Sequence, residues 1–379
     1  MEAARLTGPA RNLVEFARGL SAEAAPAREA EVSIVTFLRG EAVENAFVAA
    51  ARSAGLRVDV IRERFRFDPK VLPQLRSIID AREPHILQTH NSKSHFLVRL
   101  GGLARSRPWI AFHHGHTATD FKDRLYNQFD RFSLRQATRV VSVCAFFIQK
   151  LRRFGVAADR IEVLHNPAKP LHRPDPQALE TLRAQWKVPP EAAVILSLGR
   201  LSAEKGHRDL IEAACLLRRS RPDLVFRLFV VGDGPERKTL QQRCATLGVE
   251  DVVILTGYQS DPEPYYFLAD VFALPSRSEG SPNALLDAMA AGIPVVAASV
   301  GGVPEIVTHN ESALLAPSRD PRAMAAGLAG LLSDRALAKR LAAAALKNLE
   351  ARHRPETYRR ALLNLYDRVL QTVGSPARR

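Results

Sequence analysis

Residues Val194–Arg219 read VILSLGRLSAEKGHRDLIEAACLLRR, and this stretch carries the clearest signal of fold class. Its start, Val194–Leu198, is rich in Val, Ile and Leu and is followed by Gly199, which is typical of a β-strand. A polar loop comes next, and apolar residues then recur at helical spacing over Arg208–Arg219. A strand that leads through a short loop into a helix is the repeating unit of a parallel sheet covered by helices.

The same alternation of strands and helices runs along the whole chain. We therefore predict an α/β protein with two Rossmann-like domains, each built on a doubly wound parallel sheet. Further strands of the second half are expected at Val225–Val231, Val252–Thr256, Val271–Leu274 and Pro294–Ala298, with helices at Glu236–Leu247, Pro282–Ala291 and Pro321–Leu332. Strands of the first half are expected at Val32–Phe37, Ile86–Thr89, Trp109–Phe112, Val140–Val143 and Ile161–Leu164.

A linker between the two domains is predicted at Asn166–Pro176, which is rich in proline and polar residues. We place the N-terminal domain at residues 1–169 and the C-terminal domain at residues 170–354. A last helix over residues 355–372 is expected to join the N-terminal domain, from the helical spacing of Tyr358, Leu362, Leu365, Tyr366 and Val369.

The start of the first domain departs from the doubly wound pattern, in which the first strand is central. Here Thr7, Gly8 and Pro9 lead almost at once into an expected helix at Asn12–Leu20, and no strand-like run comes before them. We therefore expect the first domain to lack its first strand, with a chain that is truncated or whose start is placed too late.

The charge balance favours anionic partners. The 379 residues include 54 Lys or Arg against 40 Asp or Glu, a net charge of +14, and residues 122–173 hold eleven of the cations against four acids. Aromatic interleaving and nucleic-acid-binding signatures are missing, so we predict no nucleic-acid partner. An anionic membrane surface or a phosphorylated substrate fits the charge, and solvated helix faces of a basic protein explain it equally well.

The remaining composition points to a protein of the cytoplasm. Three widely spaced cysteines, Cys144, Cys215 and Cys244, form neither a disulfide framework nor a thiolate metal site. No secretory signal and no run of about 18 apolar residues is seen, so we expect a cytoplasmic location, with peripheral attachment at the inner face of the membrane as an alternative.

The segment Ser276–Gly292, SRSEGSPNALLDAMAAG, predicts a helix that presents its amino end to a ligand. Ser281 suits the N-cap, Pro282 the first helical position and Gly292 the stop. The free N–H groups at such a helix end attract phosphate. Glu279 and Asp287 would flank that end as hydrogen-bond acceptors for hydroxyls, although a capped surface helix with unrelated acids is an equally simple interpretation.

Two cations follow the strand that ends at Gly199. Arg200 and Lys205 lie in the loop beyond the carboxyl end of that strand, where open α/β sheets bind ligands, and together they would neutralise a diphosphate. The turn VVGDGP contains Gly232 and Gly234, which would let the backbone approach a ligand. Two solvated surface cations and an ordinary turn remain the alternatives, and Tyr258 serves equally well as a packing residue.

Taken together, the Gly-Arg-Leu and Lys-Gly pattern, the Gly-Asp-Gly-Pro turn and the pair Glu279 and Asp287, separated by seven residues, resemble the family-four retaining glycosyltransferases, also known as group 1 glycosyl transferases. The resemblance is strong over Val194–Ala316 and looser in the first domain. It implies a GT-B fold, in which an acceptor-side domain and a nucleotide-sugar-binding domain face each other across a cleft.

The resemblance also implies roles for single residues. Arg200 and Lys205 would bind the donor diphosphate, and Glu279 would contact the hydroxyls of the transferred sugar. The matching ribose ligand of the family is a glutamate, whereas this chain has Asp287, which is one methylene shorter and is expected to weaken donor binding. Further donor-binding residues implied by the matched motifs are Gly199, Gly232, Gly234, Tyr258, Gly280, Ser281, Pro282 and Asn283.

The first domain matches the family through a strand that ends in IAFHHGH. His114 aligns best with the histidine that faces the sugar, and His113 and His116 align less well. A metal bound by these histidines is disfavoured because no carboxylate or thiolate accompanies them. The acceptor side would be formed by Gly8 and Asn12, in a turn, and by His90 and Asn91, and ordinary strand-to-helix connections remain the alternative.

The implied reaction is transfer of a sugar, with retention of the anomeric configuration, from a nucleotide-diphosphate sugar to a lipid-linked, polysaccharide or small-molecule acceptor, as in cell-envelope polysaccharide synthesis. We expect no cofactor and no metal, since no Asp-x-Asp motif occurs. A sugar-nucleotide epimerase of GT-B fold and a weakly active or inactive binding subunit remain the alternative functions.

Overall fold

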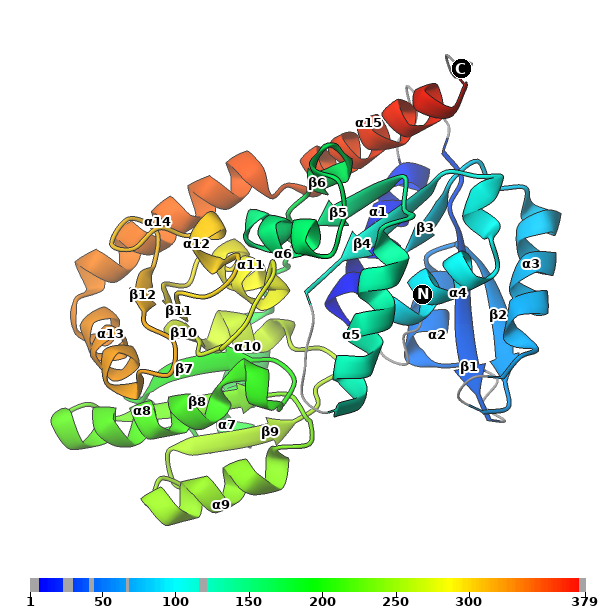
Figure 1. Ribbon diagram of the computed structural model, residues 1–379. Coiled ribbons are helices and arrows are strands. Elements are labelled where there is room, and N and C mark those ends of the chain that lie inside the picture. Colours follow the sequence, from blue (N-terminus) through cyan, green and yellow to red (C-terminus); the bar gives the residue numbers. More distant parts are fainter. Residues whose placement is uncertain (1–6, 23–29, 41–43, 66–67, 116–120, 375–379) are drawn as a thin grey trace. The chain divides into compact units, whose positions relative to one another are not determined.

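The computed structural model describes residues 7–22, 30–40, 44–65, 68–115 and 121–374. The chain divides into two compact units (Figure 1). Unit 1 comprises Met1–Pro167 together with Pro355–Arg379, and unit 2 comprises Ala168–Arg354. Both units are parallel β-sheets covered by helices, which confirms the predicted α/β class.

Unit 2 is a doubly wound domain. Its sheet has the strand order β12-β11-β10-β7-β8-β9, and every neighbouring pair is parallel. Counted from β7, this is the order 6-5-4-1-2-3, so the winding reverses between β7 and β10. The strands are β7 (Ala193–Leu198), β8 (Phe226–Val231), β9 (Val253–Gly257), β10 (Val271–Leu274), β11 (Val295–Ala298) and β12 (Leu314–Ala316).

Helices cover both faces of this sheet, and each face has its own hydrophobic core. One core packs α7, α10, α11, α12 and part of α14 against the sheet, and the other packs α8, α9 and α13. Residues of β7 alternate between the two cores, since Val194 and Leu196 belong to the first and Ile195 to the second. The helices are α7 (Pro176–Gln185), α8 (His207–Ser220), α9 (Arg237–Leu247), α10 (Glu263–Leu268), α11 (Asn283–Ala290), α12 (Val303–Ile306), α13 (Pro321–Ser333) and α14 (Arg335–Arg352).

Unit 1 contains two separate sheets within its described residues. The strands β1 and β2 pair with each other, and β3, β4, β5 and β6 form a second parallel sheet. The break between β1 and β3 falls where the first, central strand stands in a doubly wound order. The strands are β1 (Ser33–Arg39), β2 (Arg57–Glu63), β3 (Leu87–Thr89), β4 (Trp109–His113), β5 (Arg139–Ser142) and β6 (Ile161–Val163).

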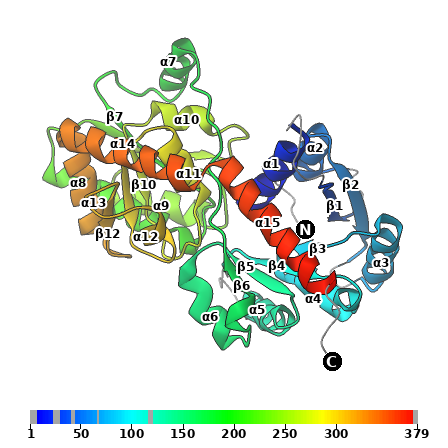
Figure 2. The ribbon, with the colours of Figure 1, turned by 90° about the horizontal axis from the view of Figure 1, so that it is seen from above.

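The last helix of the chain packs in unit 1. Helix α15 lies beside α1 (Figure 2), and its buried side chains join Phe16, Phe112 and Val141 in one core. The helices of unit 1 are α1 (Gly8–Ala22), α2 (Ala46–Ser53), α3 (Val71–Arg82), α4 (Ser92–Leu100), α5 (Phe121–Leu134), α6 (Ile148–Arg153) and α15 (Pro355–Gly374).

The structure corrects two local predictions. Helix α11 begins at Asn283, with Pro282 in extended backbone at the N-cap position and no side-chain cap, so Ser281 is not the N-cap. Helix α1 begins at Gly8, so Gly8 and Asn12 lie within a helix and not in a turn. Proline permits the helical φ of the first position but equally suits the extended residue before it, and the sequence does not separate the two.

Candidate functional site

The candidate site lies at the carboxyl ends of β7 and β10 in unit 2. These strands are neighbours, and the winding of the sheet reverses between them, which is where doubly wound domains bind ligands. The loop over residues 199–206 follows β7, and the loop over residues 275–282 follows β10. The two loops touch, because the backbone N–H of Arg277 donates a hydrogen bond of 2.8 Å to the carbonyl oxygen of Glu204.

An ion pair joins the two loops. Lys205 Nζ lies 2.7 Å from Glu279 Oε1, and Ser276 Oγ donates to the same oxygen at 2.6 Å. Glu279 is only 7% exposed, so this carboxylate is held in one orientation by a cation and a hydroxyl. Lys205 retains further N–H groups, because an ammonium carries three donors.

Glycines allow close backbone contacts around this ion pair. A Cβ on Gly301, which has φ +54°, would lie 1.8 Å from the carbonyl oxygen of Glu279. A Cβ on Gly232 would lie 1.9 Å from the carbonyl oxygen of Gly199. Residues other than glycine do not fit at these two positions without moving the loops that carry the site.

A second ion pair reinforces the junction of the loops. Arg277 donates through Nε and Nη2 to the two carboxylate oxygens of Asp209, at 3.0 and 2.8 Å. Asp209 lies in the first turn of α8, so the pair ties this helix to the segment that carries Glu279. Neither residue was predicted to act, since neither matches a residue of the family motifs.

The other predicted donor-side residues lie around the same loops. Arg200 is exposed and makes no side-chain hydrogen bond or ion pair with the described residues, and Tyr258 is 51% exposed directly after β9. Asp287 lies inside α11 and is 5% exposed. The residues Gly280, Ser281 and Pro282 are buried before α11, Asn283 begins this helix, and Gly199 and Gly234 are partly buried in their turns.

In unit 1, the structure brings His90 and His114 together. His90 Nδ1 lies 3.1 Å from His114 Nε2, and the two rings stack at a centroid distance of 5.4 Å. His113 instead packs edge-on against Phe147, and His116 lies outside the described residues. Because of burial, the pKa of His90 is well below its usual range, and burial also lowers the pKa of His114 to about 4.

The predicted acceptor-side residues lie in α1 and at the start of α4. Asn91 is the N-cap of α4, where its side chain accepts the backbone N–H of Ser94 at 2.9 Å. Asn12 is 5% exposed within α1. His90 contacts His114, the histidine that was predicted to face the sugar.

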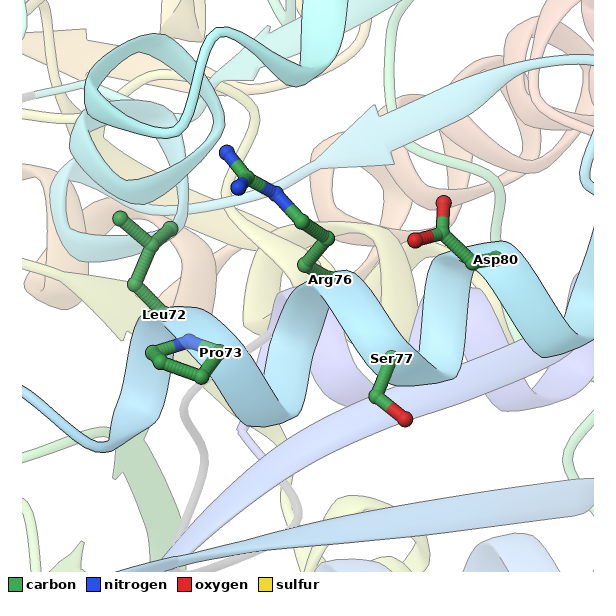
Figure 3. Close-up of a pocket in the computed structure, with 5 residues that line it drawn as sticks. All are labelled: Leu72, Pro73, Arg76, Ser77 and Asp80. Atoms are coloured by element: carbon green, nitrogen blue, oxygen red, sulfur yellow. The ribbon is translucent and has the colours of Figure 1, made fainter.

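Two hollows of the surface are lined by other residues. One of about 470 Å³ lies along α3 and is lined by Leu72, Pro73, Arg76, Ser77 and Asp80 (Figure 3). These side chains all come from a single helix, and none of them was predicted to act. Within the described ranges, no three His, Cys, Asp or Glu side chains gather as metal ligands would, and no helix is long and apolar enough to cross a membrane.

Comparison with known proteins relates both halves of the chain to enzymes that act on sugars. Residues 179–348 match the family "Glycosyl transferases group 1", and residues 7–167 match the "Glycosyl transferase 4-like domain". Among curated proteins, the chain is 32% identical over 219 residues to the lipopolysaccharide core biosynthesis glycosyltransferase LpsD of Rhizobium meliloti, covering 58% of this chain and 60% of the relative.

A second relative is the GDP-mannose-dependent α-(1-6)-phosphatidylinositol monomannoside mannosyltransferase of Mycobacterium tuberculosis, 37% identical over 194 residues, which cover 49% of this chain and 50% of the relative. The matches thus span half to three fifths of the length of these relatives. Among solved structures, Anabaena HepE in complex with UDP-glucose has a TM-score of 0.81 at 20% identity, over 97% of this chain and 98% of that chain. This last similarity establishes the GT-B fold.

Proposed function

We propose that this chain, whose two halves match the group 1 glycosyl transferases and the glycosyl transferase 4-like domain, transfers a sugar from a nucleotide-diphosphate sugar to an acceptor hydroxyl. One observation carries the proposal. Lys205, in the loop after β7, and Glu279, in the loop before α11, meet at the point where the winding of the unit 2 sheet reverses.

In the proposed reaction each group has a distinct task. The ammonium of Lys205 uses one donor on Glu279, and its remaining donors are available to diphosphate oxygens. The amino end of α11 would add the favourable dipole of a helix start for the same anion. The carboxylate of Glu279 accepts hydrogen bonds from sugar hydroxyls. Stabilisation of the departing diphosphate is the catalytic contribution of these groups.

A donor screen tests the proposal. UDP-, GDP- and ADP-sugars are compared by thermal shift, and the stabilising donors are then offered with lipid-linked, polysaccharide and small-molecule acceptors. Glu279→Ala and Arg200→Ala should each lower transfer by about a hundredfold or more. Arg219→Ala, on the far end of α8, is the control and should transfer normally. Wild-type turnover in both site variants would refute the assignment.

Retention and independence of metal complete the proposed reaction. In the proposed mechanism the donor phosphate takes the proton of the acceptor on the face from which it departs, so the product keeps the anomeric configuration of the donor. NMR of the product before mutarotation reads that configuration directly. We also expect full activity in EDTA, because Lys205, Arg200 and the α11 amino end supply the positive charge for the diphosphate. Loss in EDTA with rescue by a divalent ion would contradict this.

Epimerisation and idle binding are separated from transfer by product analysis. A labelled donor whose sugar reappears on an acceptor establishes transfer, whereas a changed sugar still on the nucleotide establishes epimerisation. This chain has Asp287 where the matched family has a glutamate, and we expect this shorter side chain to weaken donor binding, which calorimetry measures. Binding without either product would establish the idle subunit.

We further propose that unit 1 contacts an anionic membrane surface, where a lipid-linked acceptor would lie. An aromatic and cationic patch supports this on α4 and α5, and it consists of Arg99, Leu100, Phe129 and Phe132. Leu100 is 61% exposed and Phe132 54%, and the Arg99 guanidinium lies 3.2 Å from the Phe132 ring centroid. Exposed aromatic rings beside a cation are typical of a protein surface that enters lipid headgroups.

Flotation with vesicles tests this patch. Wild-type protein should float with phosphatidylglycerol vesicles, and Phe132→Ser should reduce the floating fraction several-fold. Phe65→Ser is a matched control, since Phe65 is 52% exposed and also has an arginine, Arg64, 5.5 Å from its ring centroid. Two results would contradict the proposal: a floating fraction that does not depend on the content of anionic lipid, or an equal loss of floating protein in Phe132→Ser and Phe65→Ser.

A further inference from the structure

A chain of hydrogen bonds leads from α15 to His114. Tyr366 OH donates to Gln88 Oε1 at 2.5 Å, and Gln88 Nε2 lies 2.8 Å from His90 Nε2. His90 Nδ1 in turn lies 3.1 Å from His114 Nε2. Gln88 lies on β3, His90 directly after it, and His114 directly after β4. Four side chains from two strand ends and the last helix are thus linked in one series.

The two histidines in this series are neutral. Burial lowers the pKa of both rings, that of His114 to about 4, so neither is an imidazolium near neutral pH. A neutral imidazole has one N–H donor and one acceptor nitrogen. A hydrogen bond between two neutral imidazoles therefore requires that one ring donates and the other accepts.

The first two links fix which ring donates. The amide oxygen of Gln88 only accepts, so Tyr366 is the donor at that end, and burial keeps its hydroxyl protonated by raising the pKa well above the usual value. The amide nitrogen of Gln88 then donates to His90 Nε2. His90 must carry its proton on Nδ1 and donate it to Nε2 of His114.

The consequence falls on the far side of the His114 ring. With Nε2 accepting, the proton of His114 resides on Nδ1. Nδ1 is buried and has no hydrogen-bond partner among the described residues. An unpaired buried N–H is destabilising, so a ligand oxygen that accepts this proton gains from the arrangement.

We infer that Gln88, His90 and Tyr366 are positioning residues that hold His114 as the Nδ1–H tautomer, so that it offers a donor to an oxygen of a bound sugar substrate. The inference rests on the proposed function for the identity of the ligand. His114 then acts as a hydrogen-bond donor to substrate and not as the base that takes the acceptor proton.

The tautomer is measured on the free protein by long-range ¹H–¹⁵N correlation with ¹⁵N-labelled histidine, since the two ring nitrogens give different shifts when protonated. The His114 signals are assigned by their loss in His114→Asn. Wild-type protein should show Nδ1–H at position 114. Gln88→Met and Tyr366→Phe should each shift the signals toward Nε2–H, which an unconstrained imidazole prefers. Gln128→Met, at an exposed glutamine of α5, should leave them unchanged.

Two results would overturn the inference: an Nε2–H tautomer in the wild-type chain, or an Nδ1–H tautomer that survives in both variants. Tyr366→Phe removes a single oxygen and keeps the reading available if Gln88→Met does not fold. With the donor found in the screen, both variants should lose about tenfold in kcat/KM. The NMR reading needs no sugar nucleotide, so absence of transfer in the wild type defeats the proposed function alone.

Discussion

The contact between Lys205 and Glu279 makes a stability prediction. Lys205→Met leaves the buried Glu279 carboxylate with the Ser276 hydroxyl but without a cation, and this should lower the free energy of unfolding by about 1–3 kcal/mol in urea denaturation. Arg218→Met breaks an exposed pair with Asp251 and should cost about 0–1 kcal/mol. The double variant Lys205→Met/Glu279→Gln should recover part of the loss. An equal loss of unfolding free energy in Lys205→Met and Arg218→Met would contradict a buried charge at position 279.

Gly301 makes a second prediction, because two glycines allow a matched comparison. Gly301 and Gly248 both have left-handed φ, +54° and +60°, but a Cβ on Gly248 would meet no atom within 4 Å. In both variants the left-handed conformation of the alanine costs about 1–2 kcal/mol. Only Gly301→Ala also displaces the carbonyl group of Glu279. Gly301→Ala should therefore be less stable than Gly248→Ala in thermal denaturation and should bind donor more weakly. Similar donor affinities in calorimetry would show that the close contact does not hold the site.

Some residues of the candidate site could be predicted from the sequence, and others could not. Strand ends followed by glycine or polar loops placed Lys205 and Glu279 near one ligand, because neighbouring parallel strands share an edge. The link between Gln88 and Tyr366 was not predicted, since 278 positions separate them and neither carries a motif. The ion pair of Arg277 and Asp209 was not predicted either, since these residues are also far apart in sequence and match no motif.

Among the strands, continuous apolar runs were predicted, and a strand rich in charged residues was missed. β10 was placed with its bounds, since VFAL is apolar throughout. β2 was missed, because RVDVIRE alternates with four charged residues and only Ile61 and Glu63 of this strand are buried. β12, which has three residues, was also missed, although the three-residue strands β3 and β6 were predicted. Such strands are recognised only by their neighbours in the sheet.

The ion pair of Asp209 and Arg277, which joins α8 to the loop before α11, leads to a prediction about donor binding. Asp209→Asn removes the charge that holds Arg277 in a two-point pair, and the segments that carry Lys205 and Glu279 then lose a fixed spacing. Calorimetry should show about tenfold weaker donor binding at little cost in stability. Asp223→Asn, which breaks the exposed two-point pair with Arg221, is the control. Equal affinities in the two variants would show that the tie does not position the site.

At the scale of the whole chain, a prediction concerns α15 and the stability of unit 1. This helix follows unit 2 in sequence but belongs to the core of unit 1. Leu365 is 3% exposed in that core, whereas Leu370, on the same helix, is 39% exposed. Leu365→Ala should destabilise unit 1 by about 2–5 kcal/mol, and Leu370→Ala should have little effect. Hydrogen exchange followed by mass spectrometry reads the units separately: peptides containing β4 should exchange faster in Leu365→Ala, and peptides containing β10 should not. Faster exchange in both would show that the two units unfold as one.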